Sequence, residues 1–380
     1  MHSLLDRALA AARQLGASDI HLKGGLAPIL RIDGELRTLS DVPPLSREFV
    51  QSLAMSLLND RRREILERTG DVALSITAPD GTRQRLHVWQ HRGGTAVAVR
   101  LVPAQAPPLD RLELPPATAS LVAPGAGLAV VTGPAGAGKT TTLASLVDHL
   151  GGDRACHIIT VEDPVEIVLK DRRSVVVQRE VGLDAPTTAA ALRAALRQDA
   201  DVIAVGELRD AEAIELATFA AETGRLVVAS VAARDAVSAV ARLHELEGDR
   251  PHLRARLAAV LRGIVAQQLC PRADGKGRRA VGELLLVDDE IRGHVRDAAT
   301  GPLAAALAAG RPAGSVGFDA SLIALARARQ ISKDQAVARA TTPARVREQL
   351  ADLAPSAPAS AKPREPETDD EPVEDDARAD

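Results

Sequence analysis

The chain has 380 residues, of which 46% are hydrophobic, and a formal net charge of −4 at pH 7. This length predicts two or three domains with buried cores. Aromatic residues make up only 1% of the sequence and tyrosine is absent, which argues against stacking platforms for single-stranded nucleic acid. The net charge is close to neutral and lacks the basic excess typical of proteins that bind DNA or RNA, so no nucleic-acid partner is expected.

The two cysteines, Cys156 and Cys270, lie far apart and give neither a metal-ligand spacing nor a disulfide framework. Residues 1–16 lack the apolar stretch of a signal peptide, and no run approaches the roughly 18 apolar residues of a membrane span. We therefore expect a reduced, cytoplasmic compartment and only peripheral contact with a membrane.

The first hundred residues combine one helical pattern with several strand patterns. Apolar residues recur at helical spacing over residues 3–15, and a second helical stretch is expected near 46–58. The segment PILRIDGELRTL alternates around Asp33-Gly34, which predicts a β-hairpin. A second hairpin around APDGT leads to strands in RLHVWQ and TAVAVRLVP. Residues 1–102 therefore predict a small α+β domain.

A Pro-rich segment, residues 103–112, separates this domain from a different pattern and is interpreted as a linker. The short apolar runs GLAVVTG, HIITVED, DVIAVGEL and RLVVASV then alternate with helical stretches. Runs that are apolar on both faces suit the buried strands of a parallel sheet. Residues 113–300 therefore predict an α/β core.

Ala, Leu and Arg dominate the remainder of the chain. From residue 252 to residue 353 the pattern is interpreted as mainly helical, with one strand candidate in AVGELLLV and a helical region over 301–353. The tail, residues 354–380, carries nine acidic against three basic residues and has no apolar periodicity. Such a composition predicts disorder.

The segment VVTGPAGAGKTTT contains the clearest chemical signal in the chain. Gly133 to Thr140 match the pattern G-x-x-x-x-G-K-[ST], with an expected strand before the loop and a helix after it. In this pattern backbone N–H groups face phosphate oxygens, Lys139 reaches the β- and γ-phosphates, and the Thr140 hydroxyl ligates Mg²⁺. The predicted nucleotide-binding residues are Gly133, Pro134, Ala135, Gly136, Ala137, Gly138, Lys139, Thr140 and Thr141.

Acidic residues follow two other expected strands of the same sheet. Glu207 ends the strand in DVIAVGELRD, and Glu162, Asp163 and Glu166 follow the strand in HIITVEDPVE. Pro164 stops that strand and holds the carboxylates in a turn. Either segment alone is a solvated acidic turn more often than a site, but a P-loop in the same sheet favours a role at Mg²⁺ and water.

The order of these segments resembles the secretion-type ATPases of bacterial type IV pili and type II secretion. The matching stretches include SDIHLKGGLAPILRIDGELR, GPAGAGKTTTLASL, HIITVEDPVE, SVVVQREVGLD and ALRAALRQDADVIAVGELRDAEAI. They continue through LRGIVAQQLCPRADGKGRRAVGELLL to GFDASLIALARARQISKDQAV. The resemblance therefore covers nearly everything except the tail.

This resemblance implies an α/β fold in which a small PAS-like α+β domain precedes a RecA-like P-loop core, with helices at the C-terminus. It implies ATP and Mg²⁺ as ligands, and a cytoplasmic homo-hexamer with nucleotide between the two domains. Little sequence precedes SDIH, and two cysteines cannot supply the four-cysteine insertion of many assembly and secretion members. This favours the pilus-retraction type, with an inner-membrane platform protein as partner.

The resemblance also implies roles for the acidic residues. The family's Asp box falls on Glu162 to Glu166, with Glu162 as the water-activating base and Glu166 in the same catalytic segment. The Walker B segment falls on residues 201–209, with Glu207 and Thr140 at the metal.

Arginines of the family's small domain reach the phosphates, and Arg92 and Arg100 occupy that region here. The family's earlier arginine aligns with RLHV, where His87 stands in its place. Family members also carry two histidines near the nucleotide and the subunit interface, and Arg225 and Ala232 occupy these positions. Arg225 can only donate hydrogen bonds and Ala232 offers none, whereas a neutral imidazole can both donate and accept, so we expect ATP binding with reduced turnover.

Three functions therefore remain open at this stage. The leading hypothesis is a hexameric motor ATPase for pilus retraction. The alternative is a weakly hydrolysing ring subunit that regulates, or assembles into a mixed ring with, an active paralogue. A RecA-type nucleic-acid motor is disfavoured by the absence of a basic face and of aromatic platforms.

Overall fold

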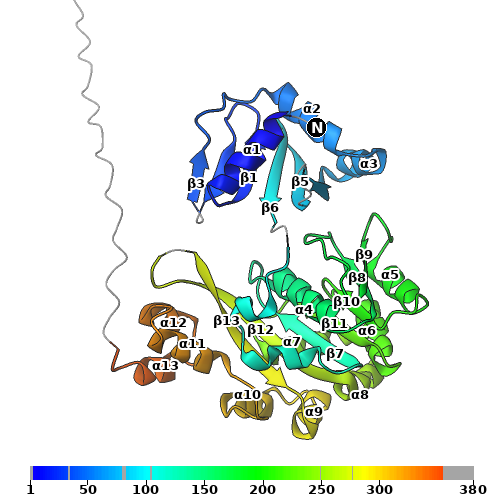
Figure 1. Cartoon of the computed structure of the whole chain (residues 1–380), viewed down its shortest axis with the longest axis vertical. Helices are drawn as coiled ribbons and strands as arrows, with labels where there is room; N and C mark the ends of the chain where they lie inside the picture. Colours follow the sequence, from blue (N-terminus) through cyan, green and yellow to red (C-terminus); the bar gives the residue numbers. More distant parts are fainter. Residues whose placement is uncertain are drawn as a thin grey trace, which may run out of the picture.

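The computed structural model describes residues 3–32, 35–78, 83–102, 105–248, 250–275 and 277–353. Its strands form two sheets, one of six strands and one of seven. Figure 1 shows the smaller sheet above the larger one, with the last helices at one end of the larger part. We call residues 3–102 the small domain and residues 105–353 the core.

The small domain is an antiparallel sheet with helices packed on it. The strand order is β3-β2-β1-β6-β5-β4. Ser46 and Asn59 cap two of the helices by accepting hydrogen bonds from the N–H groups of Phe49 and Arg62. The helices and strands are α1 (Ser3–Gln14), β1 (Ala17–Lys23), β2 (Ile29–Ile32), β3 (Glu35–Thr38), α2 (Arg47–Leu57), α3 (Asp60–Thr69), β4 (Asp71–Thr77), β5 (Arg83–His91) and β6 (Gly94–Leu101).

Most of the expected elements in this domain are confirmed. The strands on both sides of the two expected hairpins pair antiparallel, β2 with β3 and β4 with β5. The turn residues Asp33-Gly34 and 79–82 lie outside the described residues. Helix α3 was not expected from the sequence, and its residues, DRRREILERT, carry only two large apolar side chains.

The core sheet places the P-loop strand, β7, in its interior between β12 and β11. The order is β13-β12-β7-β11-β10-β8-β9, and the pairs from β12 to β9 are parallel while β13 is antiparallel to β12. This confirms the expected parallel sheet. The strands are β7 (Gly127–Thr132), β8 (His157–Glu162), β9 (Val175–Glu180), β10 (Val202–Val205), β11 (Leu226–Val231), β12 (Leu261–Pro271) and β13 (Arg278–Leu286).

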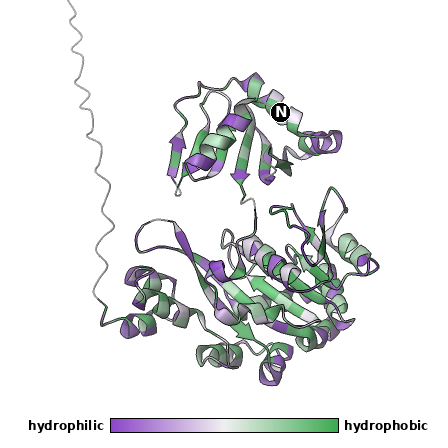
Figure 2. Cartoon of the chain, in the orientation of Figure 1, coloured by the Kyte–Doolittle hydropathy of each residue, from purple (hydrophilic) through white to green (hydrophobic). Residues whose placement is uncertain are grey.

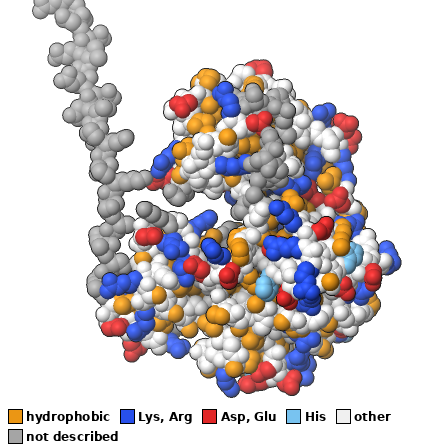
Figure 3. All heavy atoms as spheres, viewed as in Figure 1, with side chains coloured by type: hydrophobic (Ala, Val, Ile, Leu, Met, Phe, Trp, Pro, Cys, Tyr) orange, Lys and Arg blue, Asp and Glu red, His pale blue; other side chains and the backbone are white. Residues whose placement is uncertain are grey.

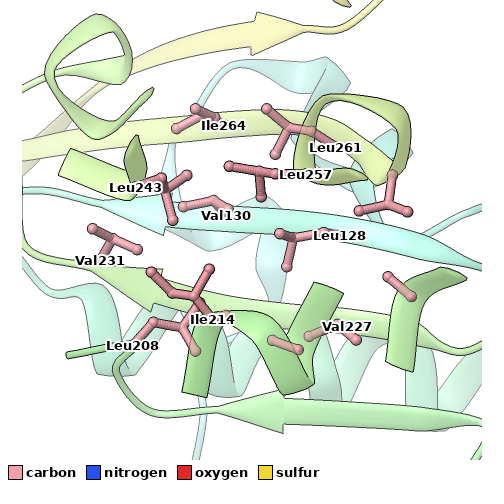
Figure 4. Close-up of a cluster of buried hydrophobic side chains, with 14 of the residues drawn as sticks. Leu128, Val130, Leu208, Ile214, Val227, Val231, Leu243, Leu257, Leu261 and Ile264 are labelled. Carbon is pink, nitrogen blue, oxygen red and sulfur yellow. The ribbon is translucent and has the colours of Figure 1, made fainter. Parts of the chain in front are cut away.

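Helices cover both faces of this sheet. Leu128 and Val130 of β7 pack toward α5–α10 on one face, whereas Ala129 and Val131 pack toward α4 on the other. Figure 2 shows the strands of the core sheet as mainly hydrophobic, and Figure 4 shows the first of these clusters around β7. The helices are α4 (Lys139–Asp153), α5 (Thr188–Ala195), α6 (Ala211–Glu222), α7 (Ala236–Glu247), α8 (Pro251–Val260), α9 (Asp289–Arg296) and α10 (Thr300–Ala308).

Three short helices follow at the C-terminal end and pack around Cys270 and Val281. They are α11 (Phe318–Arg327), α12 (Lys333–Arg339) and α13 (Pro343–Gln349). Within the described ranges, no helix has both the length and the apolar character that a membrane crossing requires. The acidic tail, residues 354–380, lies outside the described residues.

Two expectations for the core differ from the structure. The segment at 261–271 was interpreted as helix, but it forms β12, which is buried between β7 and β13. The linker is also shorter than expected, because Leu109 packs against the α4 side of the core. Two 3-10 helices, η1 (Leu109–Leu112) and η2 (Pro116–Leu121), follow there.

Candidate active site

The carboxyl ends of parallel strands bring the P-loop, Glu162 and Glu207 to one edge of the core sheet. The P-loop follows β7, Glu162 ends β8, Glu207 follows β10 and Ala232 follows β11. The Gly206 N–H donates to the Val161 carbonyl at 2.8 Å, which joins the ends of β8 and β10. Ligands of open parallel sheets bind at this edge, so the topology supports one site.

The P-loop has the backbone conformation that its glycines were expected to supply. Gly136 and Gly138 have φ of 74° and 92°, in the left-handed region where a side chain is strained. Lys139 opens helix α4 directly after Gly138, so the loop leads into a helix N-terminus. Successive N–H groups at such a terminus form a binding site for phosphate oxygens.

Gln267 of β12 supports this loop from beneath, and the sequence did not reveal it. Its side-chain amide donates to the Ala137 carbonyl at 2.7 Å and accepts from the Thr142 hydroxyl at 2.7 Å. Gln267 is 3% exposed, and its backbone carbonyl would lie 2.4 Å from a Cβ placed on Gly133. One buried side chain therefore fixes the P-loop to α4.

The Lys139 ammonium lies at the mouth of the loop. Nζ donates to the Gly133 carbonyl at 2.8 Å and to the Pro134 carbonyl at 3.2 Å. Burial lowers the pKa of Lys139, while the nearby Glu207 carboxylate acts in the opposite direction. The cation is thus held close to both the loop and a carboxylate.

The surroundings of Glu162 shift the pKa of its carboxyl group. Its Oε1 accepts from the Thr160 hydroxyl at 2.6 Å and from the Gln178 amide at 2.9 Å. Desolvation by the surrounding protein raises the pKa of Glu162, and these two donors oppose that shift. Glu162 and Thr140 line the same small pocket of about 10 Å³. A carboxylate with a raised pKa beside a P-loop suits a general base.

Glu207 belongs to a chain of ionic contacts along the same edge. The Arg209 guanidinium donates to Glu207 at 2.9 Å and to Asp163 at 3.1 Å. Arg209 therefore joins the segment after β10 to the turn after β8. The Glu207 carboxylate keeps 27% of its side-chain surface exposed, so it remains open to a ligand.

Arginines of the small domain contact the turn after β8. Arg85 of β5 donates to Glu166 at 3.2 Å, and Arg83 donates to the Val165 carbonyl at 3.0 Å. Arg62 and Arg83 also pair with Glu180 of β9, at 3.0 and 2.7 Å. On the face seen in Figure 3, Lys and Arg side chains gather where the small domain meets the core. No sequence motif pointed to Arg62, Arg83 or Arg85, because their partners lie far away along the chain.

The arginines that were predicted for this role lie elsewhere in the chain. Arg100 of β6 donates to Asp19 of β1 at 2.9 Å. Arg92 lies in the turn between β5 and β6, beside a cavity of about 620 Å³ that Lys23 and Arg47 also line. A contact of Arg92 or Arg100 with phosphates stays a prediction.

The structure places His87, which the resemblance puts at the family's earlier arginine, on the surface of the small domain, and that assignment stays a prediction. The His87 ring lies 2.9 Å from the Asp71 carboxylate, on the small domain, with half of its side chain exposed. Arg85, the first residue of the same RLHV segment, is the side chain that reaches the core.

The two positions expected to carry histidines lie at opposite edges of the core sheet. Arg225 precedes β11 and donates to the Thr223 hydroxyl and the Leu196 carbonyl, at the amino edge of the sheet. Ala232 follows β11 at the P-loop edge and is exposed. Within this chain only Ala232 lies at the P-loop edge, and the expectation that both positions lie near the nucleotide and the subunit interface stays a prediction for Arg225.

Comparison with known proteins agrees with this architecture. The family described as Type II/IV secretion system protein matches residues 1–313. The Type IV pilus retractation ATPase PilT of Pseudomonas aeruginosa is 33% identical over 337 residues, 88% of this chain and 97% of that protein. The uncharacterized protein YggR of Escherichia coli is 36% identical over 320 residues, 83% of this chain and 96% of its own length.

Solved structures give the same result. The crystal structure of the pilus retraction motor PilT with bound ADP has a TM-score of 0.80 and 37% identity, covering 90% of this chain and 98% of that one. The ATPase DotB of Legionella pneumophila has a TM-score of 0.72 and 26% identity, covering 88% and 94%.

The chain therefore belongs to the Type II/IV secretion system protein family, a family of secretion and pilus ATPases. Within it, the chain is similar over most of its length to the pilus-retraction ATPase PilT. The resemblance inferred from the sequence motifs is confirmed.

Proposed function

We propose that the chain is a hexameric motor ATPase that couples ATP binding and hydrolysis to type IV pilus retraction. The observation that carries this proposal is the meeting of the P-loop, Glu162 and Glu207 at one edge of the core sheet. The similarity to a pilus retraction motor over 90% of the chain supports the choice of filament. Its place of action is the cytoplasmic face of the inner membrane, at a platform protein.

The residues present fit a nucleoside triphosphate. The N–H groups of the P-loop and the Lys139 ammonium bind and orient the phosphates. The carboxylate of Glu162 accepts a proton from the attacking water, which it can do only when it is ionised. Arg85, which now pairs with Glu166, supplies a small-domain cation at the same edge.

The residues also fit Mg²⁺, because a hydroxyl and a carboxylate are oxygen donors of the kind that this ion prefers. The Thr140 hydroxyl and the Glu207 carboxylate would hold the ion. When bound, Mg²⁺ neutralises charge that develops on the phosphate oxygens. Arg209 orients Glu207 by donating to it at 2.9 Å.

One observation favours the alternative, a weakly hydrolysing ring subunit that regulates, or assembles into a mixed ring with, an active paralogue. Ala232 offers no polar group at the P-loop edge, where the resemblance implies a histidine. Loss of one contact to the transition state lowers turnover by roughly a hundredfold without preventing binding. Both candidates share ATP binding and ring assembly, and they differ in turnover.

Assembly and motility together test the motor proposal. The mass of the purified full-length chain is measured by light scattering, with and without a non-hydrolysable ATP analogue and Mg²⁺. We expect a hexamer that the analogue stabilises. In a bacterium that carries this gene, Lys139→Ala at the chromosomal locus is expected to abolish twitching. Normal twitching in that strain would contradict a role in retraction.

A further inference from the structure

Glu180, at the end of β9, is a buried carboxylate that the proposed mechanism does not use. It is 3% exposed. Its Oε1 lies 3.0 Å from the Arg62 guanidinium of α3, and its Oε2 lies 2.7 Å from the Arg83 guanidinium of β5. Both cations come from the small domain, more than ninety residues away along the chain. One core carboxylate therefore receives two arginines across the domain boundary.

The same carboxylate also holds the turn that carries the candidate base. The Val165 N–H donates to Glu180 Oε2 at 3.3 Å, while the Val165 carbonyl accepts from Arg83 at 3.0 Å and from the Ser75 hydroxyl at 3.2 Å. Both backbone groups of Val165 are thus held by this contact set. Val165 lies three residues after Glu162, within the Glu162–Glu166 turn.

Glu180 also lies directly beside Glu162 in the sheet. The two residues are register partners of the parallel strands β8 and β9, and the Val181 N–H donates to the Glu162 carbonyl at 2.8 Å. Gln178, two residues earlier on β9, donates to the Glu162 carboxylate. The end of β9 therefore supports both the backbone and the side chain of the candidate base.

Such a contact set specifies geometry more than it adds stability. A buried ion pair contributes little compared with a hydrophobic pair of the same volume, but removal of one partner leaves an uncompensated buried charge. Displacement of the small domain would remove both guanidinium groups from Glu180. The docked position of the small domain is therefore tied to the conformation of the Glu162–Glu166 turn.

We propose that Glu180 is a positioning residue through which the small domain, by Arg62 and Arg83, sets the geometry of the Glu162–Glu166 turn. This inference rests on the proposed function, in which Glu162 serves ATP hydrolysis. When the small domain moves away, Glu180 loses both arginines and the Glu162–Glu166 turn loses the geometry that hydrolysis needs, while the P-loop stays unchanged. The position of the small domain therefore controls hydrolysis through one buried carboxylate.

The test compares full-length Glu180→Gln and Arg62→Ala with wild type. Glu180→Gln keeps the shape of the side chain and removes its charge. Because Glu180 is proposed to hold the turn and not to bind the nucleotide, we expect kcat to fall by about tenfold to a hundredfold. KM for ATP is expected to stay within about threefold of wild type. Arg62→Lys restores part of the loss, and Arg62→Ala adds nothing to Glu180→Gln because the two side chains act as one unit.

Arg68→Ala is the matched control, since Arg68 is an exposed arginine on the same helix. It is expected to leave kcat and KM at the wild-type values. Unchanged kcat in both Glu180→Gln and Arg62→Ala would overturn the proposal. A loss of kcat in Arg68→Ala as large as the loss in Arg62→Ala would also overturn it, because the effect would then belong to α3 as a whole.

Hydrogen exchange separates this inference from the proposed function, because it needs no turnover. The Val165 amide is expected to exchange faster in Glu180→Gln and in Arg62→Ala than in wild type, with the P-loop amides unchanged. If wild type does not hydrolyse ATP, the proposed function fails. The exchange rates at Val165 then decide alone whether Glu180 positions the turn. Faster exchange at Val165 supports the positioning role, and equal exchange rejects it.

Discussion

Gln178 of β9 donates its side-chain amide to the Glu162 carboxylate at 2.9 Å, and the same amide donates to the Ile167 carbonyl at 2.9 Å. This contact links the two ends of the turn that follows β8. It also opposes the rise that desolvation causes in the pKa of Glu162, because a donor to a carboxylate favours its ionised form. The pH dependence of the enzyme therefore depends on a residue outside the catalytic motifs.

Gln178→Ala is expected to move the acid limb of the kcat profile to higher pH. The pKa of Glu162 is already raised by desolvation, and turnover is lost as the pH falls through that pKa because the base becomes protonated. Removal of the amide donor raises the pKa further. Turnover as a function of pH measures the shift. Gln198→Ala, at an exposed glutamine, is the control, and a shift of equal size there would refute the interpretation.

Gln267→Ala is expected to weaken both the fold and ATP binding. The substitution leaves the Ala137 carbonyl and the Thr142 hydroxyl without their partner in a buried place. Such groups cost about 1–3 kcal/mol each when unpaired. Urea unfolding and the ATP dissociation constant measure the two effects. Gln268→Ala at the neighbouring position serves for comparison, and a Gln267→Ala protein with wild-type affinity would show that the loop does not need this support.

Arg85→Ala is expected to lower turnover, and His87→Ala is expected to leave it unchanged. Arg85 pairs with Glu166 across the domain boundary, whereas His87 pairs with Asp71 on the surface of the small domain. Lost stabilisation of developing phosphate charge costs kcat more than ATP affinity. Steady-state kinetics of both variants decide this point. Lower turnover in His87→Ala with unchanged turnover in Arg85→Ala would instead support a role of His87 at the phosphates.

Ala232→His is expected to raise turnover by roughly tenfold, because an imidazole at this position can donate a hydrogen bond near the P-loop. Ala232 is exposed at the carboxyl edge of the sheet, so the larger side chain has room. Arg225→His is expected to have little effect within a protomer, since Arg225 lies at the opposite edge. ATP turnover of each single variant measures this. A rise in Arg225→His alone would place the important contact between neighbouring subunits.

The sequence predicted those parts of the fold that local patterns encode. The buried runs of β7, β8, β10 and β11 are apolar on both faces, and their parallel pairing follows from that pattern. β12 was missed because LRGIVAQQLCP continues an Ala- and Leu-rich helical stretch and contains two glutamines. Its strand conformation depends on pairing with β7 and β13, which are distant in sequence.

The candidate site also combines residues that local motifs reveal with contacts that depend on distant parts of the chain. The P-loop has a spacing that marks its chemistry before any fold is known, and Glu162 and Glu207 were predicted from their places after other expected strands of the same sheet. The contacts that hold these residues could not be predicted in this way, since Gln267 meets the P-loop from 130 residues away and Arg62 meets Glu180 from 118 residues away. Long-range partners of this kind are set by the arrangement of the two sheets.

Steady-state ATP turnover of the purified full-length chain, measured with Mg²⁺ beside the Lys139→Ala variant, tests the central claim most directly. Lys139→Ala removes a cation from the mouth of the P-loop, and Lys170→Ala, at an exposed lysine, is the control. We expect measurable turnover in wild type and Lys170→Ala, with neither turnover nor ATP binding in a folded Lys139→Ala. ATP affinity in Lys139→Ala equal to that of wild type would contradict the claim.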